Sequence, residues 1–312
     1  MLKYVLKRLG YILVTLWVIV TCTFFMMKNL PGTPFDAERF SIMTPQQQER
    51  VLEMYGLNDS LPMQYVKYIK NMLQGDLGTS FTYVNKDVSK VITGRLGPSA
   101  LIGIQAVLIG LAIGLILGIL AAWKHNSGID YLTMILAVLG VSVPNFVAAA
   151  LLQYYIGLKW GALPVGFWTG WNCSVLPSIA LSFSATAMVA RFMRTEMLDV
   201  LDQDYIVTAR AKGLSQMKVL MRHAVRNSIL PVVTILGPIV VNLMTGSLAV
   251  ENIFSIPGIG SLFVDCIKAN DYPVIMGITI FYAAFYMLIV LLVDLAYSLI
   301  DPRIRLAKGK ES

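Results

Sequence analysis

Charge is scarce in this sequence, and so are the residue types from which metal sites are built. Only 14% of the 312 residues are charged, whereas soluble domains carry about 25%. The three cysteines and two histidines show no spacing typical of a metal site. With 56% hydrophobic residues and a mean hydropathy of +0.68, the composition excludes an ordinary soluble domain and indicates an integral membrane protein.

The motifs of several enzyme classes are also absent. There is no G-x-x-x-x-G-K-[ST] phosphate loop, so the chain is not expected to hydrolyse ATP itself. There is neither an H-E-x-x-H metal motif nor a G-x-S-x-G nucleophile elbow. No nucleic-acid-binding pattern accompanies the net charge of +7, and in membrane proteins such an excess lies mostly in cytoplasmic loops. The sequence therefore disfavours an enzyme and predicts no cofactor, no metal and no nucleic-acid partner in this chain.

The sequence contains a series of long apolar runs instead. A helix needs about 20 mostly apolar residues to cross the hydrocarbon core. Six runs meet this requirement: 9–28, 99–123, 131–158, 175–193, 229–250 and 274–300. The first is too long for a signal-peptide core and has no cleavage site after it, so we expect it to be retained. The predicted fold class is an all-α integral membrane protein with six transmembrane helices.

The distribution of Lys and Arg predicts that both termini lie inside. With that orientation, 15 of the 25 basic residues are inside and 10 are outside. Eight of the 10 lie in or beside the long 28–98 loop, and long loops cross the membrane with little regard to charge. In the short connections only Lys159 and Lys268 are outside. We therefore expect a tail and first helix over 1–28, an extracytoplasmic helical domain over 29–97, and a membrane core over 98–312 with a cytoplasmic tail at 301–312.

The 29–97 segment carries its own helix signals. Thr44 followed by Pro45 is typical of an N-cap with proline at the first helical position. Apolar residues then repeat at helical spacing before Gly75, a candidate C-cap; they are Met63, Val66, Ile69 and Leu73. Composition leaves two interpretations open, a cap on the helix bundle and a docking surface for an external partner.

Small residues and prolines mark positions inside the predicted spans. Gly110, Gly114 and Gly118 recur every four residues and predict close packing of a second helix. Pro144 interrupts the third run and Pro238 the fifth, and each permits a kink or a break that lines a pathway.

One carboxylate and two cysteines raise questions of pairing. Asp294 lies well inside the last run, where an ionisable group suggests either a functional site or a structural ion pair. We favour an ion pair with Arg191 or Arg194. Cys173 and Cys266 both fall outside in the predicted topology, which allows a disulfide, although sequence cannot bring their Cα atoms together.

The most unusual stretch is the basic segment, residues 204–231, between the fourth and fifth runs. Lys218, Arg222 and Arg226 recur every four residues, and a second stripe of the same predicted helix is apolar. That apolar stripe contains Leu214, Met217, Leu220, Met221 and Ala224. Three interpretations remain open on physical grounds: a solvated loop, a helix on anionic lipid, and a helix that docks into another protein.

The basic segment also resembles the signature loop of binding-protein-dependent ABC importer permeases. The matching residues are Asp204-Tyr205-Ile206, Thr208 to Ser215, His223-Ala224, Arg226-Asn227 and Leu230-Pro231. The general pattern has Glu-Ala-Ala where this chain has Val207-Thr208-Ala209, and the gap from Gly213 to Pro231 is longer. Both departures are typical of the dipeptide and oligopeptide branch, and the chain looks most like its first oligopeptide permease subunit.

Further matches to that branch extend along nearly the whole chain. They are 30–35, Gly75-Asp76-Leu77-Gly78 with Ser80, 141–144 with Phe146, Leu176-Pro177, 251–260, 271–277 and 301–305. No single motif would identify this branch of the family, but the whole series of motifs in this order is specific for it.

The resemblance implies a division of labour among subunits. It implies a second homologous permease, two ABC ATPase subunits that bind ATP and Mg, and an extracytoplasmic peptide-binding lipoprotein, all assembled in membrane lipid. The 194–228 loop would be the coupling loop, through which ATPase closure switches the spans by alternating access. ATPase contact would come from Thr208, Ala209, Arg210, Lys212, Gly213 and Leu214. The alternative is a membrane-embedded enzyme or assembly scaffold with a lipid-binding cytoplasmic helix.

Overall fold

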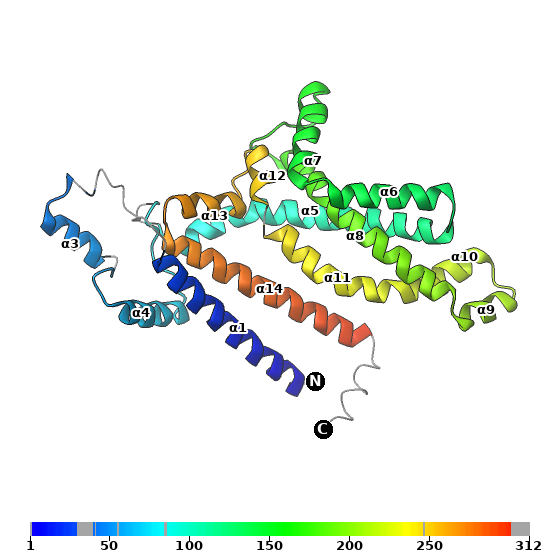
Figure 1. Ribbon diagram of the computed structural model, residues 1–312, viewed down its shortest axis with the longest axis horizontal. Helices are drawn as coiled ribbons and strands as arrows, with labels where there is room; N and C mark the ends of the chain where they lie inside the picture. Colours follow the sequence, from blue (N-terminus) through cyan, green and yellow to red (C-terminus); the bar gives the residue numbers. More distant parts are fainter. Residues whose placement is uncertain are drawn as a thin grey trace. The chain divides into compact units, whose positions relative to one another are not determined.

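The computed structural model describes residues 2–29, 40, 42–54, 56–83, 86–245 and 247–300 (Figure 1). In this part of the chain the regular elements are helices, which confirms the predicted all-α class. The chain divides into two compact units, one of Met1–Gly97 with Gly258–Phe285 and one of Pro98–Pro257 with Tyr286–Ser312. They are called the first and the second unit below.

Among the described residues, five helices are long and apolar enough to cross a membrane. They are α1 (Leu2–Lys28), α5 (Val88–Trp123), α8 (Val175–Leu201), α11 (Arg226–Met244) and α14 (Tyr272–Ile300). The third predicted span consists of two helical parts separated by a sharp bend. If these two parts are counted together as one span, the total rises to six. Its parts are α6 (Gly128–Ser142), α7 (Asn145–Leu152) and the π-helix η1 (Gln153–Lys159).

The bend in the third span has a local cause. The axis turns by 101° between α6 and the α7–η1 pair. Val143 has φ −80° and ψ 119°, an extended conformation, because a residue before proline is disfavoured in the helical region. Pro144 then precedes the first helical residue of α7 with its own φ at −59°. The interruption that Pro144 predicts is therefore present.

Proline has a different outcome in the fifth span. Pro231 and Pro238 both lie inside α11, which continues from Arg226 to Met244. The helix is therefore not broken at Pro238, and a kink or a pathway role for this proline stays a prediction. A proline in a helix interior removes one backbone hydrogen bond, and packing against neighbouring helices can compensate within a membrane bundle.

The first unit contains the two helices predicted between the first and second spans, α3 (Pro45–Met54) and α4 (Leu61–Leu73). At α3 the Gln47 amide N–H faces Thr44 Oγ1 at 3.4 Å, and the Thr44 N–H donates to Gln47 Oε1 at 2.9 Å, a capping box. At α4, Gly75 has φ +81° and follows the C-cap, as predicted. Its N–H bonds to Met72 O and the Asp76 N–H to Asn71 O, which is a Schellman motif.

The apolar stripe of α4 does not form a core. Met63, Val66 and Leu73 are exposed. The helix contacts α1 through a different face, where Tyr65 Oη lies 2.7 Å from Thr21 Oγ1 and Tyr65 and Tyr68 pack on the Phe24 ring. Helical spacing therefore predicted this helix correctly, but not which of its faces is buried.

A buried carboxylate fastens a loop of the first unit to the start of α14. Asp271 is fully buried and accepts hydrogen bonds from Ser80 Oγ, from Phe81 N at 3.1 Å and from Thr82 N at 3.0 Å. Close by, a Cβ on Gly277 would lie 2.5 Å from Val88 Cγ1. The core of the unit joins α5, α14 and α13 (Ile259–Lys268).

We expect Asp271→Asn to lower the free energy of unfolding by about 1–2 kcal/mol, because the amide nitrogen cannot accept one of the buried donors. The measurement is the thermal unfolding midpoint of the detergent-solubilised protein. Asp265→Asn is the control, since that side chain is exposed in the same unit. Equal midpoints for the two variants would contradict the role of Asp271.

The second unit is organised around α8. This helix contacts α6, α7 and α11 and supplies core side chains along its length, including Leu176, Leu181, Val189, Met193 and Met197. The short helix η2 (Trp171–Ser174) leads into it. Gln153 Nε2 donates to Val165 O at 2.6 Å and to Ile253 O at 2.7 Å, which ties η1 to α12 (Leu248–Ile253).

Cys173 and Cys266 are free thiols, and each is buried in a different unit. Burial, aided by the negative charges of Asp271 and Asp265, raises the pKa of Cys266 to about 12. The thiol of Cys266 is therefore protonated at neutral pH and is a poor nucleophile.

Candidate functional site

The basic segment folds as a compact structure directly after α8. It begins with α9 (Asp204–Ala211), reverses at Gly213, and continues through α10 (Gln216–Lys218) and the π-helix η3 (Val219–Val225) into α11 (Figure 1). Asn227 Nδ2 donates to Tyr205 Oη at 3.0 Å, which links α9 to the start of α11. The segment is thus a folded connection between two spans and not a loose loop.

Gly213 ends α9 in a conformation that glycine adopts easily. Its φ is +78°. Its N–H donates to Arg210 O at 2.9 Å, and the Leu214 N–H donates to Ala209 O at 3.4 Å, the two hydrogen bonds of a Schellman motif. No atom lies within 4 Å of a Cβ placed on Gly213. Backbone strain, and not a steric clash, therefore disfavours a side chain at this position.

A small apolar cluster holds α9 against its surroundings. Ile206, Ala209 and Val219 are buried together and pack against Val200 and Leu201 at the end of α8. Ala209, at 6% exposure, therefore faces inward and is not part of the accessible surface. The other residues predicted for ATPase contact are exposed: Thr208, Arg210, Lys212, Gly213 and Leu214.

Large apolar side chains are also exposed in this segment, and Leu214 is one of them. We call this set the apolar coupling surface, and it consists of Tyr205, Val207, Leu214, Met217 and Met221. Val207 is the most exposed of them at 60%. Exposed apolar groups that gather in one segment mark an interaction site more often than singly scattered ones do.

The two predicted stripes of the basic segment are only partly retained. Lys218, Arg222 and Arg226 are all exposed, as a basic stripe requires. The predicted apolar stripe is divided, because Leu220 and Ala224 are buried whereas its other members are exposed. The π-helical stretch η3 separates these positions, since a π-helix places residues at a different angular spacing from an α-helix.

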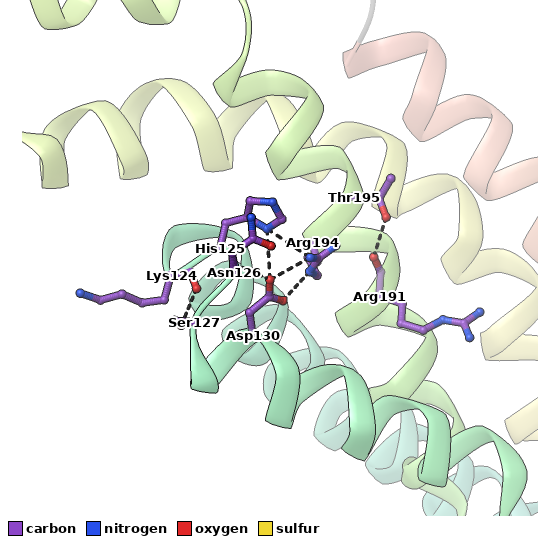
Figure 2. Close-up of polar contacts among 8 residues, drawn as sticks. All are labelled: Lys124, His125, Asn126, Ser127, Asp130, Arg191, Arg194 and Thr195. Atoms are coloured by element: carbon purple, nitrogen blue, oxygen red, sulfur yellow. Dashed lines mark hydrogen bonds and ion pairs between the residues drawn. The ribbon is translucent and has the colours of Figure 1, made fainter.

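A buried ion pair lies between α6 and α8, on the part of α8 that leads to the basic segment (Figure 2). Arg194 Nε donates to Asp130 Oδ1 at 2.6 Å, and Arg194 Nη2 donates to Oδ2 at 2.8 Å. The Asn126 N–H donates to Oδ2 at 3.0 Å. His125 Nδ1 lies 3.1 Å from Oδ2 and 3.2 Å from Arg194 Nη2. We call Asp130 and Arg194 the α6–α8 clamp.

Burial makes this clamp energetically important. The Asp130 side chain is 2% exposed and that of Arg194 21%. Arginine presents a planar fork that matches a carboxylate with two parallel hydrogen bonds. Removal of one partner from such a buried pair leaves an uncompensated charge, at a cost of about 3–5 kcal/mol.

Sequence analysis did not identify Asp130 as a site residue. Residues Ser127-Gly128-Ile129-Asp130 match the [ST]-x-x-[DE] pattern that marks the start of a helix before an apolar run. This pattern could have drawn attention to Asp130. Either Arg191 or Arg194 was expected to pair with Asp294; Arg194 forms an ion pair with Asp130, and the pairing of Asp294 stays a prediction. Asp294 lies in α14, and its side chain falls outside the described residues.

The glycines every four residues on α5 lie where α8 approaches closely. A Cβ on Gly110 would lie 2.7 Å from Ala185 Cβ, and one on Gly114 would lie 2.7 Å from Val189 Cβ and 2.8 Å from Thr186 O. On Gly118 it would lie 2.6 Å from Ala190 O. No side chain fits at these positions without movement of α8.

The bend of the third span borders an apolar cavity of about 610 Å³. Its walls come from α5, α6, α7, η1 and α8, and they include Leu117, Gly140, Val143, Ala148, Tyr155 and Phe183. Pro144 is the hinge residue between two of these walls. Pro238 is not among the residues that line the cavity.

Two family descriptions match almost the entire chain. "Binding-protein-dependent transport system inner membrane component" matches residues 114–306. "Binding-prot-dependent transport system membrane comp, N-term" matches residues 1–97.

Curated relatives and a solved structure agree with this assignment. The chain is 46% identical to the dipeptide transport system permease protein DppB of Lactococcus lactis over 98% of its own length and 100% of the relative's. It is 38% identical to the oligopeptide transport system permease protein OppB of Escherichia coli, with the same coverage. A crystal structure of an amino acid ABC transporter with histidines shares the fold, with a TM-score of 0.51 and 20% identity over 69% of this chain and 94% of that one.

The expected family resemblance, reached from the ordered motifs, is confirmed, and the relatives are transporter permease subunits and not enzymes. The chain belongs to the family of binding-protein-dependent transport system inner membrane components, and it is a multi-pass protein of the bacterial cell membrane.

Proposed function

We propose that this chain is one of two homologous transmembrane subunits of an ATP-driven importer that carries peptides into the cell by alternating access. A lipid-anchored binding protein would deliver the peptide from outside. Two ABC ATPase subunits would bind ATP and Mg on the inside. Relatives named as dipeptide and as oligopeptide permeases are both similar over nearly the full chain, which supports peptides as the substrate class.

The observation that carries this proposal is the folded and exposed basic segment. With both termini inside, as the positive charges predict, the segment faces the cytoplasm. Five residues predicted for ATPase contact are exposed there, and one of them, Leu214, belongs to the apolar coupling surface. Ala209 is buried in helix α9 and packs against the end of α8, which holds the exposed residues in place. A displacement of α9 by an ATPase would thus act directly on a span.

The same geometry weighs against a helix that lies on lipid. An interfacial helix presents its whole apolar face to the acyl boundary. Here Leu220 and Ala224 are buried inside the protein, and Ile206 and Ala209 pack α9 against Val219 and the end of α8. A rigid projection with mixed apolar and basic groups suits a protein groove better than a membrane surface.

Substitution of Gly213 provides the test. Gly213→Val forces a β-branched residue into the left-handed region, whereas Gly213→Asn places a tolerated residue there. Strain of about 1–2 kcal/mol would lower the ratio of folded to unfolded turn by a factor of about 5 to 30. We expect peptide uptake by Gly213→Val to fall by up to that factor and uptake by Gly213→Asn to stay near the wild-type rate.

The measurement uses the complete importer in vesicles, with the second permease, the ATPases and the binding protein. Uptake of labelled peptides of graded length and ATP hydrolysis are recorded together, and the amount of assembled complex is determined for each variant. Wild-type uptake and hydrolysis in both variants would refute the coupling role of Gly213. A wild-type complex that hydrolyses ATP but accumulates no peptide of any length would refute the proposed substrate class.

A further inference from the structure

The α6–α8 clamp has no place in the function proposed so far. It is located at the start of α6, and Arg194 lies seven residues before the end of α8. After Leu201 only Asp202 and Gln203 separate α8 from α9. The clamp therefore lies close along the chain to the segment on which an ATPase would act.

The geometry of the clamp restricts relative movement of α6 and α8. Two parallel hydrogen bonds join one guanidinium to one carboxylate, and the backbone N–H of Asn126 donates a third hydrogen bond to that carboxylate. A large rotation or slide of either helix would strain or break these hydrogen bonds at a carboxylate that is only 2% exposed. One isolated hydrogen bond would permit such rotation.

Farther along the chain, α6 and α8 are also in close van der Waals contact. A Cβ on Gly140 of α6 would lie 3.0 Å from Ala187 Cβ and 3.0 Å from Phe183 O of α8. Gly140 lies three residues before Val143, where the third span bends. The two helices are thus joined by charge near the basic segment and by close packing near the bend.

We propose that Asp130 and Arg194 are positioning residues that make α6 follow α8, so that a displacement of α9 reaches the bend at Pro144. This inference rests on the proposed function, since it assigns a route by which the ATPase acts on the third span. A buried ion pair between two helices in a well-packed bundle can carry such coupling because it has few alternative arrangements.

Arg194→Lys is the informative variant, because lysine keeps the positive charge and lacks the planar fork. We expect the complete importer with this variant to assemble in normal amount and to hydrolyse ATP, while uptake falls about two- to thirtyfold. The ATP consumed per peptide rises by the same factor. Arg191→Lys is the matched control on the same helix, since the exposed Arg191 side chain points away from the cluster (Figure 2), and it should leave the ratio unchanged.

A distance measurement tests the proposal independently of peptide import. Spin labels at the exposed positions Leu132 on α6 and Met188 on α8, with Cys22 replaced by serine, report the separation of the two helices by pulsed electron resonance. We expect one narrow distance in the wild-type importer with and without bound ATP, and a broader distribution for Arg194→Lys in the ATP-bound state.

Three results would overturn the proposal. The first is a wild-type distance that changes between the two nucleotide states. The second is a narrow distance and a normal ATP-to-peptide ratio in Arg194→Lys. The third is a parallel loss of assembled complex, ATP hydrolysis and uptake, which would indicate a purely structural pair. An importer that accumulates no peptide but shows the expected distances would refute the proposed substrate and leave the positioning role supported.

Discussion

Replacement of Gly114 by leucine is expected to abolish stable packing of α5 on α8. A Cβ at this position would lie 2.7 Å from Val189 Cβ, 2.8 Å from Thr186 O and 2.9 Å from Val189 Cγ1. Two of these atoms belong to a β-branched side chain and one to the helix backbone, so neither yields by a simple rotamer change. Overpacking typically costs about 1–3 kcal/mol, and the backbone contact places Gly114→Leu at or above the upper end of that range.

The same helix offers a matched control. Gly94 is also inside α5, and no atom lies within 4 Å of a Cβ placed there. Gly94→Leu should therefore keep or slightly raise stability, because leucine is the better helix former. The measurements are the yield of monodisperse protein in detergent and its thermal midpoint. If Gly114→Leu and Gly94→Leu gave the same yield and the same thermal midpoint, α5 and α8 would not be in close contact at Gly114.

The second large effect is expected from Arg194→Met. The substitution leaves the Asp130 carboxylate at 2% exposure without its cation. Loss of one partner of a buried pair costs about 3–5 kcal/mol. Asp130→Leu should cost less, because the Arg194 side chain is 21% exposed and its guanidinium keeps some contact with water.

The double variant with Asp130→Leu and Arg194→Met separates charge from packing. Replacement of a whole buried pair by apolar residues of similar volume is often neutral, so the double variant should be more stable than either single one. Chemical denaturation of the solubilised protein gives the three changes in unfolding free energy. A double variant that loses the sum of the two single effects would contradict a direct interaction between the side chains.

Local sequence signals anticipated most of the helices and two of their ends. Hydropathy located the spans, since twenty apolar residues have few alternatives in a membrane protein. Gly75 and Gly213 both end helices with a positive φ, and glycine is the residue that adopts this conformation without strain. Pro144 marked the break in the third span, where the preceding residue is forced out of the helical region.

Polar contacts between residues far apart in the sequence could not be predicted from local sequence patterns. Asp130 and Arg194 are 64 residues apart in the sequence, and Ser80 and Asp271 are 191 apart. Spacing patterns describe one helix at a time and contain no information on which polar groups the packing brings together. Arg191 or Arg194 was favoured as the partner of Asp294 because Asp294 was the one carboxylate well inside an apolar run of the sequence.

Burial within an element was also hard to predict. Helical spacing placed Met63, Val66 and Leu73 on one face of a helix, yet these apolar side chains are exposed while Tyr65 and Tyr68 contact α1. In a membrane protein, apolar residues face lipid and partner subunits as well as the core. Apolar character alone therefore does not distinguish an internal face from an external one.

The break before Pro144 leaves a backbone carbonyl group of the third span without its usual hydrogen-bond donor. Proline has no N–H, so the Gly140 carbonyl has lost the donor that an uninterrupted helix would supply four residues later. Hydrocarbon cannot hydrogen-bond to that oxygen, and exposed irregular backbone does not persist in contact with lipid. The backbone at the bend is therefore expected to face the neighbouring helix α8 or water in the adjoining cavity instead of lipid.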